Sequence, residues 1–400
     1  MKIAYICADL GVPVFGYKGC SIHVQEIIRA FLNQGATVTL FTPRPGGEAP
    51  LDLEGVTVVA LPSDAPKDPS QREIFSQALN QYITTALAQS GPFDMIYERY
   101  ALWSYAAMEF AKSKAIPSIL EVNAPLIEEQ SRHRQLINRS EAEQSTRRAF
   151  ASASTLVAVS GEVASYLDSY DETCGRVQVI GNGVNPARFQ WPPAPKSSDT
   201  FTIGFVGTLK PWHGLDGLID AFALLHHNDT DARLLIVGDG PKREELEKSL
   251  HAHGLTHAAH FTGAVAPDSV PALLASMDVA VAPYPDNPDF YFSPLKVLEY
   301  MAAGLPVVAS RIGQLSSLIQ HGDNGLLYPA GQPTALAEAL QQLMNNSALR
   351  CTLGNQARHT VAQAHSWQSV AQRILNIAAI TATQPPQPLT QTSLNSVSQQ

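Results

Sequence analysis

Short apolar runs of strand length alternate with amphipathic stretches of helical length along nearly all of this chain of 400 residues. In the first half, the order strand, helix, strand predicts a parallel sheet wound with right-handed crossovers, because parallel neighbours need a long return connection. Amphipathic helices are predicted at 22–34 and 70–89. The predicted strands are 3–8, 37–41, 56–61, 95–97, 118–122 and 156–159.

The same alternation starts again after a proline-rich segment, WPPAPKSSD, at residues 191–199. A chain of this length exceeds what one hydrophobic core usually organises, so we expect two domains joined by that segment. Ligands of such sheets bind at the carboxyl ends of the strands, which predicts a site in a cleft between the two domains. The strands predicted in the second half are 201–206, 233–237, 260–262, 279–282 and 307–309.

Charge and cysteine content exclude several classes of protein. The formal net charge of −9 argues against a nucleic-acid partner, because phosphate contacts need clustered Lys and Arg. No apolar run approaches the roughly 18 residues of a spanning helix, and the first strand is too short for a signal-peptide core. An arginine-rich stretch at 130–148 predicts ordinary surface pairs or, alternatively, a basic face that meets an anionic lipid surface or a lipid-diphosphate acceptor. Reduced, buried thiols in a cytosolic chain are expected for the four well-separated cysteines, Cys7, Cys20, Cys174 and Cys351.

The sharpest local pattern is DNPDFYFSPLKVLEYMAAGLPVVAS, residues 286–310. A serine N-cap, a proline in the first turn and a closing glycine predict a short helix at 293–303, followed by a buried strand. The free N–H groups of a helix start favour an anionic or oxygen-rich ligand. The residues at this start are Ser293, Pro294 and Leu295. Glu299 then brings a carboxylate that can accept hydrogen bonds from sugar or ribose hydroxyls, or alternatively belongs to a solvated helix face.

A glycine-rich loop follows the first predicted strand. Gly16 and Gly19 precede a helix expected to open near Ser21, and glycines let a backbone approach a ligand phosphate. The spacing is not GxGxxG, so a simple turn is the alternative.

Neither half combines GxGxxG with an acidic residue about twenty positions later, which disfavours a nicotinamide dehydrogenase. His23 is expected to pack within its helix rather than to catalyse.

The sequence GLPVVA at 304–309, with Glu299 upstream, resembles the motif of the large retaining glycosyltransferase family 4, also described as glycosyl transferases group 1. That family has the α/β GT-B fold, in which two doubly wound Rossmann-like domains face each other across a cleft. It carries two glutamates separated by seven residues; Glu299 matches the second, and Tyr291 replaces the first. The strand-end histidine that faces the transferred sugar in many relatives is replaced by Asn123.

The segment GTLKPWHG at 207–214 resembles the family's Gly-Arg-Leu, three residues and Lys-Gly, in which the two cations neutralise the donor diphosphate. Gly207 opens the turn, and Thr208 and His213 occupy the two cationic positions. The resemblance therefore implies Lys210 as the cation for the leaving diphosphate, unless this side chain is merely exposed. His213 is expected to assist as a hydrogen-bond donor, or as an imidazolium if the diphosphate raises its pKa.

By the same resemblance, an N-terminal, acceptor-side Rossmann-like domain spans 1–190 and a linker spans 191–200. A C-terminal domain at 201–360 binds the nucleotide sugar, and a helix at 361–380 crosses back to the first domain. The remainder, 381–400, is rich in Gln, Thr, Ser and Pro and is expected to be disordered.

The resemblance implies a metal-independent, retaining, hexosyltransferase-type enzyme of glycan biosynthesis. The donor is expected to be a UDP- or GDP-linked sugar, used as substrate without a cofactor, and the product a polysaccharide, a glycolipid or another glycoconjugate. The acceptor class, whether glycan, lipid-linked or small molecule, stays open. An epimerase or phosphorylase on the same fold and a catalytically inactive binding subunit are the alternatives. We expect a cytoplasmic protein, with peripheral contact at the inner face of a membrane as a further alternative.

Replacing Lys210 with alanine should weaken the affinity for a nucleoside diphosphate about tenfold or more, because a charge-assisted hydrogen bond to phosphate is lost. Isothermal titration calorimetry measures the effect directly. Unchanged binding would remove Lys210 from the donor site.

Overall fold

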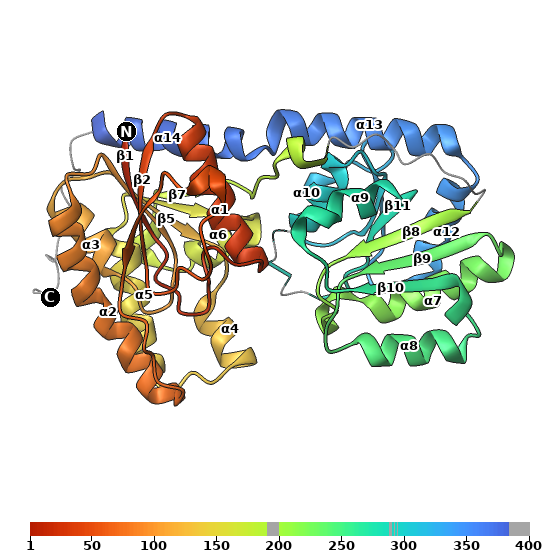
Figure 1. The fold of residues 1–400 in the computed structure, drawn as a ribbon, viewed down its shortest axis with the longest axis horizontal. Helices are drawn as coiled ribbons and strands as arrows, with labels where there is room; N and C mark the ends of the chain where they lie inside the picture. Colours follow the sequence, from red (N-terminus) through yellow and green to blue (C-terminus); the bar gives the residue numbers. More distant parts are fainter. Residues whose placement is uncertain (190–199, 288–289, 292, 294, 384–400) are drawn as a thin grey trace, which may run out of the picture.

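A computed structural model of the chain describes residues 1–189, 200–287, 290–291, 293 and 295–383 (Figure 1). The first half forms a parallel sheet of seven strands in the order β3-β2-β1-β4-β5-β6-β7. Its strands are β1 (Lys2–Ile6), β2 (Thr37–Thr42), β3 (Thr57–Ala60), β4 (Met95–Arg99), β5 (Ser118–Val122), β6 (Thr155–Ala158) and β7 (Val177–Val179). Its helices are α1 (Gly19–Asn33), α2 (Pro69–Ser90), α3 (Ala106–Ser113), α4 (Leu126–His133), α5 (Arg139–Ser152) and α6 (Gly161–Asp168).

The second half forms a parallel sheet of six strands in the order β10-β9-β8-β11-β12-β13. Its strands are β8 (Phe201–Val206), β9 (Ala232–Val237), β10 (Ala259–Gly263), β11 (Val279–Ala282), β12 (Val307–Ser310) and β13 (Leu326–Tyr328). The helices are α7 (Leu215–Asn228), α8 (Arg243–Ala252), α9 (Val270–Ala275), α10 (Leu295–Ala302), α11 (Leu315–Leu318), α12 (Pro333–Met344), α13 (Ser347–Ala364) and α14 (Trp367–Thr383). The predicted α/β class with two doubly wound sheets is confirmed, although β13 was not among the predicted strands.

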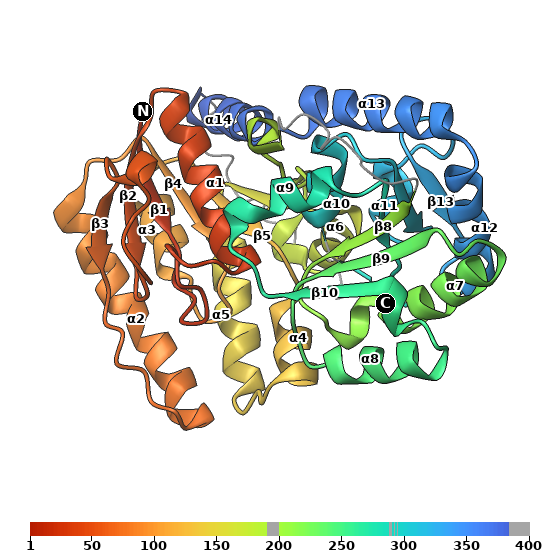
Figure 2. The same cartoon turned by 45° about the vertical axis from the view of Figure 1, so that its right-hand side comes forward.

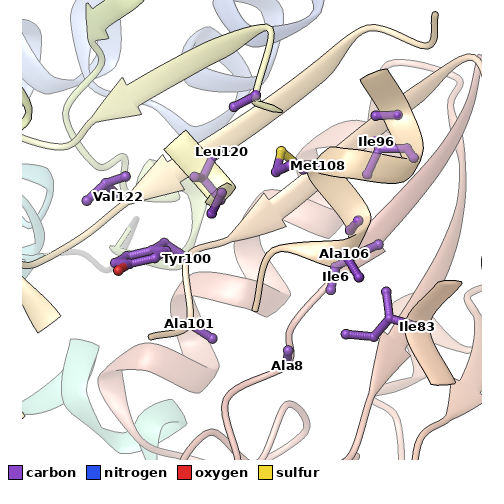
Figure 3. Packing of buried hydrophobic residues seen from close by; sticks show 14 of the residues in the cluster. Ile6, Ala8, Ile83, Ile96, Tyr100, Ala101, Ala106, Met108, Leu120 and Val122 are labelled. Carbon is purple, nitrogen blue, oxygen red and sulfur yellow. The ribbon is translucent and has the colours of Figure 1, made fainter. Parts of the chain in front are cut away.

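Helices cover both faces of each sheet, which buries the strands on both sides (Figures 1 and 2). In β1, Ile3 and Tyr5 belong to one core cluster, whereas Ala4 and Ile6 belong to the cluster on the opposite face. This division follows from the two-residue period of a strand. Figure 3 shows the second cluster, in which Ile6 and Leu120 come from different strands of the sheet. Each fully buried aliphatic side chain contributes roughly 1.5–3 kcal/mol.

The helix predicted at 361–380 begins only at Trp367, because a break separates α14 from α13, which ends at Ala364. The break has a tertiary cause: the backbone N–H of Val184 donates to the carbonyl of His365 (2.8 Å), and the N–H of Trp367 donates to the carbonyl of Val184 (3.1 Å). The chain between α13 and α14 therefore pairs with the first half of the protein instead of continuing the helix.

Helix α14 lies against α1 and the first sheet, while α13 lies over the second half (Figures 1 and 2). The Trp367 ring meets the His23 ring edge-on, with centroids 5.0 Å apart. His23 is buried, as expected for a packed helix residue. The α14 residues buried in the core of the first half are Trp367, Val370, Ala371, Ile374 and Ala378.

Several expectations fall on residues outside the described ranges. The segment 190–199, which holds most of the predicted linker, and residues 384–400 of the predicted tail are not described. Residues 381–383 belong to α14, so the expected disordered tail does not begin at 381. The domain limits otherwise stay predictions.

The described residues also correct the expectation for the cysteines. All four are free thiols, and Cys7 is buried, but Cys174 and Cys351 are exposed. Both lie where local helical or turn structure places them on the surface, so the expectation of buried thiols was wrong for this pair. Among the helices described, none has the length and apolarity to cross a membrane.

The packing of α14 can be tested with Ile374→Ala. This side chain is buried against the first half, so we expect the substitution to lower the free energy of unfolding by roughly 2–5 kcal/mol, from lost burial and a residual cavity. Urea unfolding measures the change. Gln372→Ala, at an exposed position of the same helix, should have little effect. Equal stabilities for the two variants would contradict the packing described.

Candidate active site

The strand orders locate the edges of both sheets where a ligand can bind. In each sheet the order reverses at one point, between β1 and β4 in the first and between β8 and β11 in the second. Connections leave in opposite directions there, which opens a crevice beyond the carboxyl ends of the strands. The turn after β8 and the helix α10, which follows β11, therefore border the ligand edge of the second sheet.

The hydroxyl of Tyr300 fixes α10 to the end of β8. It accepts a hydrogen bond from the N–H of Val206 (2.8 Å) and lies 3.2 Å from the carbonyl oxygen of the same residue, to which it donates. The ring is completely buried. The start of α10 is thus held beside the turn that begins at Gly207.

Gly207 and Gly238 let two strand-to-helix turns touch. Their φ angles are 146° and 137°, and a Cβ on Gly238 would lie 2.1 Å from the carbonyl oxygen of Gly207. The N–H of Leu209 also donates to the carbonyl of Asp239 (3.0 Å). Backbone packing alone therefore requires glycine at these two positions, whether or not a ligand binds there.

The turn after β8 carries the predicted phosphate-binding side chains. Lys210 is half-buried, with its ammonium 5.6 Å from the centroid of the Trp212 ring. Nδ1 of His213 lies 2.6 Å from the carbonyl oxygen of Thr208. A carbonyl only accepts hydrogen bonds, so Nδ1 carries the proton and Nε2 is left as an acceptor.

Electrostatics keep the His213 ring neutral. Burial, together with the nearby charges of Lys296 and Lys210, lowers the pKa of His213 to about 3. The ring of His213 is therefore neutral in the unliganded protein at neutral pH, and an imidazolium beside a bound diphosphate stays a prediction. A neutral ring protonated on Nδ1 has no second N–H, so Nε2 is an acceptor in the unliganded protein, and hydrogen-bond donation by His213 to a bound diphosphate stays a prediction.

Helix α10 starts at Leu295, two residues later than expected, and Pro294 lies outside the described residues. The carbonyl of Ser293 accepts from the N–H of Leu295 (3.0 Å). Ser293 lines a small cavity of about 60 Å³ together with Asn182 and Gln314. Leu295 packs toward the core of the first half, so this helix start lies at the junction of the two halves.

Glu299 lies in a crevice of about 20 Å³ lined by residues from both halves, including Glu26 and Arg188. Burial raises the pKa of Glu299 to about 7, although Arg188 and Lys296 act in the opposite direction. Arg188 itself lies 4.0 Å from the carboxylate of Glu26. Within the part of the chain that is described, the Glu299 carboxylate accepts no hydrogen bond, and the residue is half-buried rather than fully enclosed. The carboxylate oxygens can therefore accept hydrogen bonds from a ligand.

Lys296, one turn before Tyr300, was not singled out by the sequence. Its ammonium lies 4.3 Å from the centroid of the Phe205 ring and 5.6 Å from that of Tyr284. Burial lowers the pKa of Lys296 to about 7, with Glu299 acting against this shift. In the sequence, the indication of a role for this residue was that a lysine stands in the otherwise apolar first turn of the helix.

Tyr291, which replaces the first glutamate of the motif, bridges the two halves. Its hydroxyl donates to a carboxylate oxygen of Glu129 (3.2 Å), and its carbonyl accepts from the hydroxyl of Ser160 (3.2 Å). The side-chain amide of Gln314 donates to the carbonyl of Val159 (3.1 Å) nearby. The loop before α10 is therefore tied to the first half by several polar contacts.

Asn123 belongs to a buried network at the end of β5. Its Nδ2 donates to the Glu121 carboxylate (2.5 Å), which also contacts Nε2 of His23 (2.7 Å) and accepts from the Tyr97 hydroxyl. Burial alone would raise the pKa of Glu121, but His23, Tyr97 and Asn123 lower it to about 2. Glu121, missed by the sequence reasoning, thus fixes the amide of Asn123.

The loop after β1 borders a larger cavity of about 300 Å³ in the first half. A Cβ on Gly16 would lie 2.9 Å from the Pro13 ring, so a tight turn accounts for this glycine. Gly19 is already the first residue of α1, earlier than the predicted start, and a Cβ there would meet open space. Ala8, Ile83 and Ala101 line this cavity and lie along the lower edge of the cluster in Figure 3. The core thus forms the apolar floor of the cavity.

The predicted site residues therefore fall into separate groups. Gly207, Lys210 and His213 gather with Lys296 at the end of β8, and Glu299 lies one turn along α10 at the junction of the halves. Asn123 lies in the network of the first sheet, while Gly16 and Gly19 lie on the loop and helix after β1. No group of three His, Cys, Asp or Glu side chains placed to hold a metal occurs among the described residues.

Solved structures share this arrangement. The crystal structure of Anabaena HepE in complex with UDP and glucose has a TM-score of 0.70 at 20% identity and covers 95% of this chain and 99% of that chain. WaaG, a glycosyltransferase involved in lipopolysaccharide biosynthesis, has a TM-score of 0.70 at 17% identity, covering 96% and 100%. At these identities the likeness concerns the fold, and together with the two facing sheets it defines the GT-B class.

Sequence comparison specifies the family. The model described as Glycosyltransferase Family 4 matches residues 17–188, and the model described as Glycosyl transferases group 1 matches residues 200–346. The chain belongs to glycosyltransferase family 4 and is a glycosyltransferase, which confirms the resemblance stated from its motifs.

Curated relatives agree with this assignment. An uncharacterized glycosyltransferase of Methanocaldococcus jannaschii is 33% identical over 218 residues, which span 51% of this chain and only 54% of that relative. A D-inositol 3-phosphate glycosyltransferase of Jonesia denitrificans is 27% identical over 94% of this chain and 95% of its own length.

Glu121→Gln tests the network around Asn123 through pH. Because the folded-state pKa of Glu121 lies near 2, below its ordinary value of 4.5, its ionisation stabilises the fold above pH 4.5, and this contribution is lost as the pH falls toward 2. We expect the variant to be less stable than the parent by roughly 2–3 kcal/mol at pH 7, with a gap that narrows below about pH 4.5. Urea unfolding at several pH values provides the comparison. A pH-independent gap would mean that ionisation of Glu121 contributes nothing.

Proposed function

We propose that this glycosyltransferase transfers a sugar, with retention of configuration, from a nucleotide-sugar donor to an acceptor hydroxyl. The observation that carries the proposal is Glu299, a half-buried carboxylate in a crevice between the halves that has no hydrogen-bond donor in the described structure. Glu299 is half-buried, and burial raises its pKa, so its carboxylate gains from hydrogen bonds that a ligand supplies. The hydroxyl groups of a ribose or a sugar are donors of the required type.

Relatives support a nucleotide sugar as donor. Anabaena HepE has been crystallised with UDP-glucose, and a mannosyltransferase of Mycobacterium tuberculosis, 27% identical over 53% of this chain, is named as GDP-mannose-dependent. We therefore propose a UDP- or GDP-linked hexose as the substrate, with no cofactor and no metal. The turn after β8, with Lys210, would face the diphosphate.

The proposed reaction needs no proton acceptor from the protein. The bond between C1 of the sugar and the diphosphate oxygen breaks, and its electron pair leaves with the diphosphate. The acceptor oxygen forms a bond to C1 on the same face, and its proton passes to an oxygen of the departing phosphate. This scheme suits Asn123, because an amide can orient a hydroxyl but does not exchange a proton near neutrality. Stabilisation of the leaving diphosphate then becomes the main task of the site.

We assign the acceptor to the cavity of about 300 Å³ in the first half. Asp9, Arg72 and Glu129 supply polar groups to its lining, and Trp103 lies among its apolar groups. The contact from Tyr291 to Glu129 brings this cavity close to the loop before α10. A hydroxylated acceptor with an apolar part suits such a lining, and glycan, lipid-linked and small-molecule acceptors all remain within the proposal.

The proposed surroundings are cytoplasmic. Four free cysteines support a reducing compartment. In the arginine-rich stretch, Arg139, Arg147 and Arg148 form ion pairs with acidic neighbours, which supports an ordinary surface there. Peripheral contact with a membrane stays an untested alternative.

Glu299→Gln should lower kcat/KM for the donor about 100-fold, because the amide replaces a charged acceptor for ligand hydroxyls. The donor is first identified by thermal stabilisation on a panel of nucleotide sugars. The circular dichroism spectrum should remain that of the parent.

Glu244→Gln, on the exposed surface of α8, is the matched control and should keep the parent kinetics. Near-normal kcat/KM for Glu299→Gln would refute the assignment of the donor site to α10.

A further inference from the structure

The ammonium group of Lys296 lacks a partner of its own. It is inaccessible to solvent, and it makes no hydrogen bond within the described structure. An ammonium carries three donors, and burying it without an acceptor or a counter-charge is costly. The rings of Phe205 and Tyr284, at 4.3 Å and 5.6 Å, offset part of this cost through cation–π attraction. The arrangement thus shelters an amine that has no acceptor and, because burial lowers its pKa to about 7, is only partly charged near neutral pH until an anion binds.

The position of this charge points to a ligand. A Cβ on Gly207 would lie 2.9 Å from Nζ of Lys296, so the ammonium lies directly beside the turn after β8. That turn and α10 flank the point between β8 and β11 where the strand order reverses. Ligands of doubly wound sheets bind at this edge. The contact of Tyr300 with Val206 holds the helix, and with it the lysine stem, in this place.

Neighbouring groups do not satisfy the charge. Glu299 is on the same face of α10, yet it forms no ion pair with Lys296 in the described residues. The neutral ring of His213 has its proton directed at the carbonyl of Thr208. Lys210 adds a second positive charge rather than a counter-charge. An anion is therefore the missing partner at this edge.

From this geometry we infer that Lys296 binds the terminal phosphate of a nucleoside diphosphate at the turn that begins at Gly207. The inference rests on the proposed function, which supplies a ligand with such a phosphate, and it adds a cation that the motif positions 208 and 213 do not provide. The flexible stem of lysine lets the ammonium leave the Phe205 ring for a phosphate oxygen, because a charge-assisted hydrogen bond is stronger than the ring contact.

During transfer, the same contact would act on the leaving group. As the bond from C1 to the diphosphate breaks, the electron pair moves onto the phosphate oxygen, and the Lys296 ammonium donates a hydrogen bond to the growing charge. The lysine remains protonated throughout, because the acceptor proton goes to the departing phosphate. Lys296 is then a binding residue that also stabilises the leaving group.

Lys296→Met tests this inference, since methionine keeps an unbranched stem of similar length without the charge. Titration calorimetry on the full chain compares UDP with UMP, and GDP with GMP, in parent and variant. We expect the variant to lose at least about tenfold in affinity for the diphosphate, but less than about threefold for the monophosphate, which lacks the terminal phosphate. The preference for diphosphate over monophosphate should therefore collapse.

Two further variants make the result decisive. Lys248→Met, at an exposed position of α8, removes the same charge from the same half and should keep the parent affinities. If thermal unfolding shows that Lys296→Met does not fold, Lys296→Gln takes its place in the same calorimetric comparison, with the same expected change in affinities.

The outcomes separate this inference from the proposed function. If the parent binds UDP or GDP and the Lys296 variants keep its preference for the diphosphate within twofold, the role of Lys296 is wrong and the proposed function stands. If the parent binds neither diphosphate, the proposed function fails, and the inference fails with it.

Discussion

The hydrogen bonds between the Tyr300 hydroxyl and the backbone of Val206 are the constraint on which the second half of the site depends. They fasten α10 to the end of β8, so the first turn of this helix cannot move independently of the turn at Gly207. Because Lys296 and Glu299 lie on this helix, a sheltered cation and a sheltered carboxylate are held at the same sheet edge. The chemistry proposed for the protein follows from that fixed pairing of helix and strand.

Two glutamates, the buried Glu121 and the half-buried Glu299, differ in whether neighbouring side chains satisfy their charge. His23, Tyr97 and Asn123 all contact Glu121, and these contacts outweigh burial and lower its pKa to about 2. Burial dominates at Glu299 instead and raises its pKa to about 7. The first carboxylate stabilises the fold, whereas the second costs stability in the unliganded protein, as is common for groups reserved for a ligand. The lowered pKa of Lys296 belongs to the same pattern.

The sequence predicted the two doubly wound sheets, because each buried parallel strand appears as a compact apolar run and each helix as an amphipathic one. It missed β13, whose three residues, Leu326–Tyr328, are too few for a periodic signal, and the break before Trp367, which pairing with Val184 imposes from a distance. The motif glutamate could be found by spacing. The importance of Lys296 could not be predicted, because it depends on contacts between segments far apart in the chain. The tautomer of His213 could not be predicted either, because it depends on the position of one local carbonyl.

The most direct test of the central claim, that the donor binds between α10 and the turn after β8, is a crystal structure of the protein with UDP or GDP bound. The account predicts a terminal phosphate oxygen within about 3 Å of Nζ of Lys296 and the ribose hydroxyls within hydrogen-bond distance of Glu299. A nucleotide bound elsewhere, with Lys296 still lying over the Phe205 ring, would contradict it.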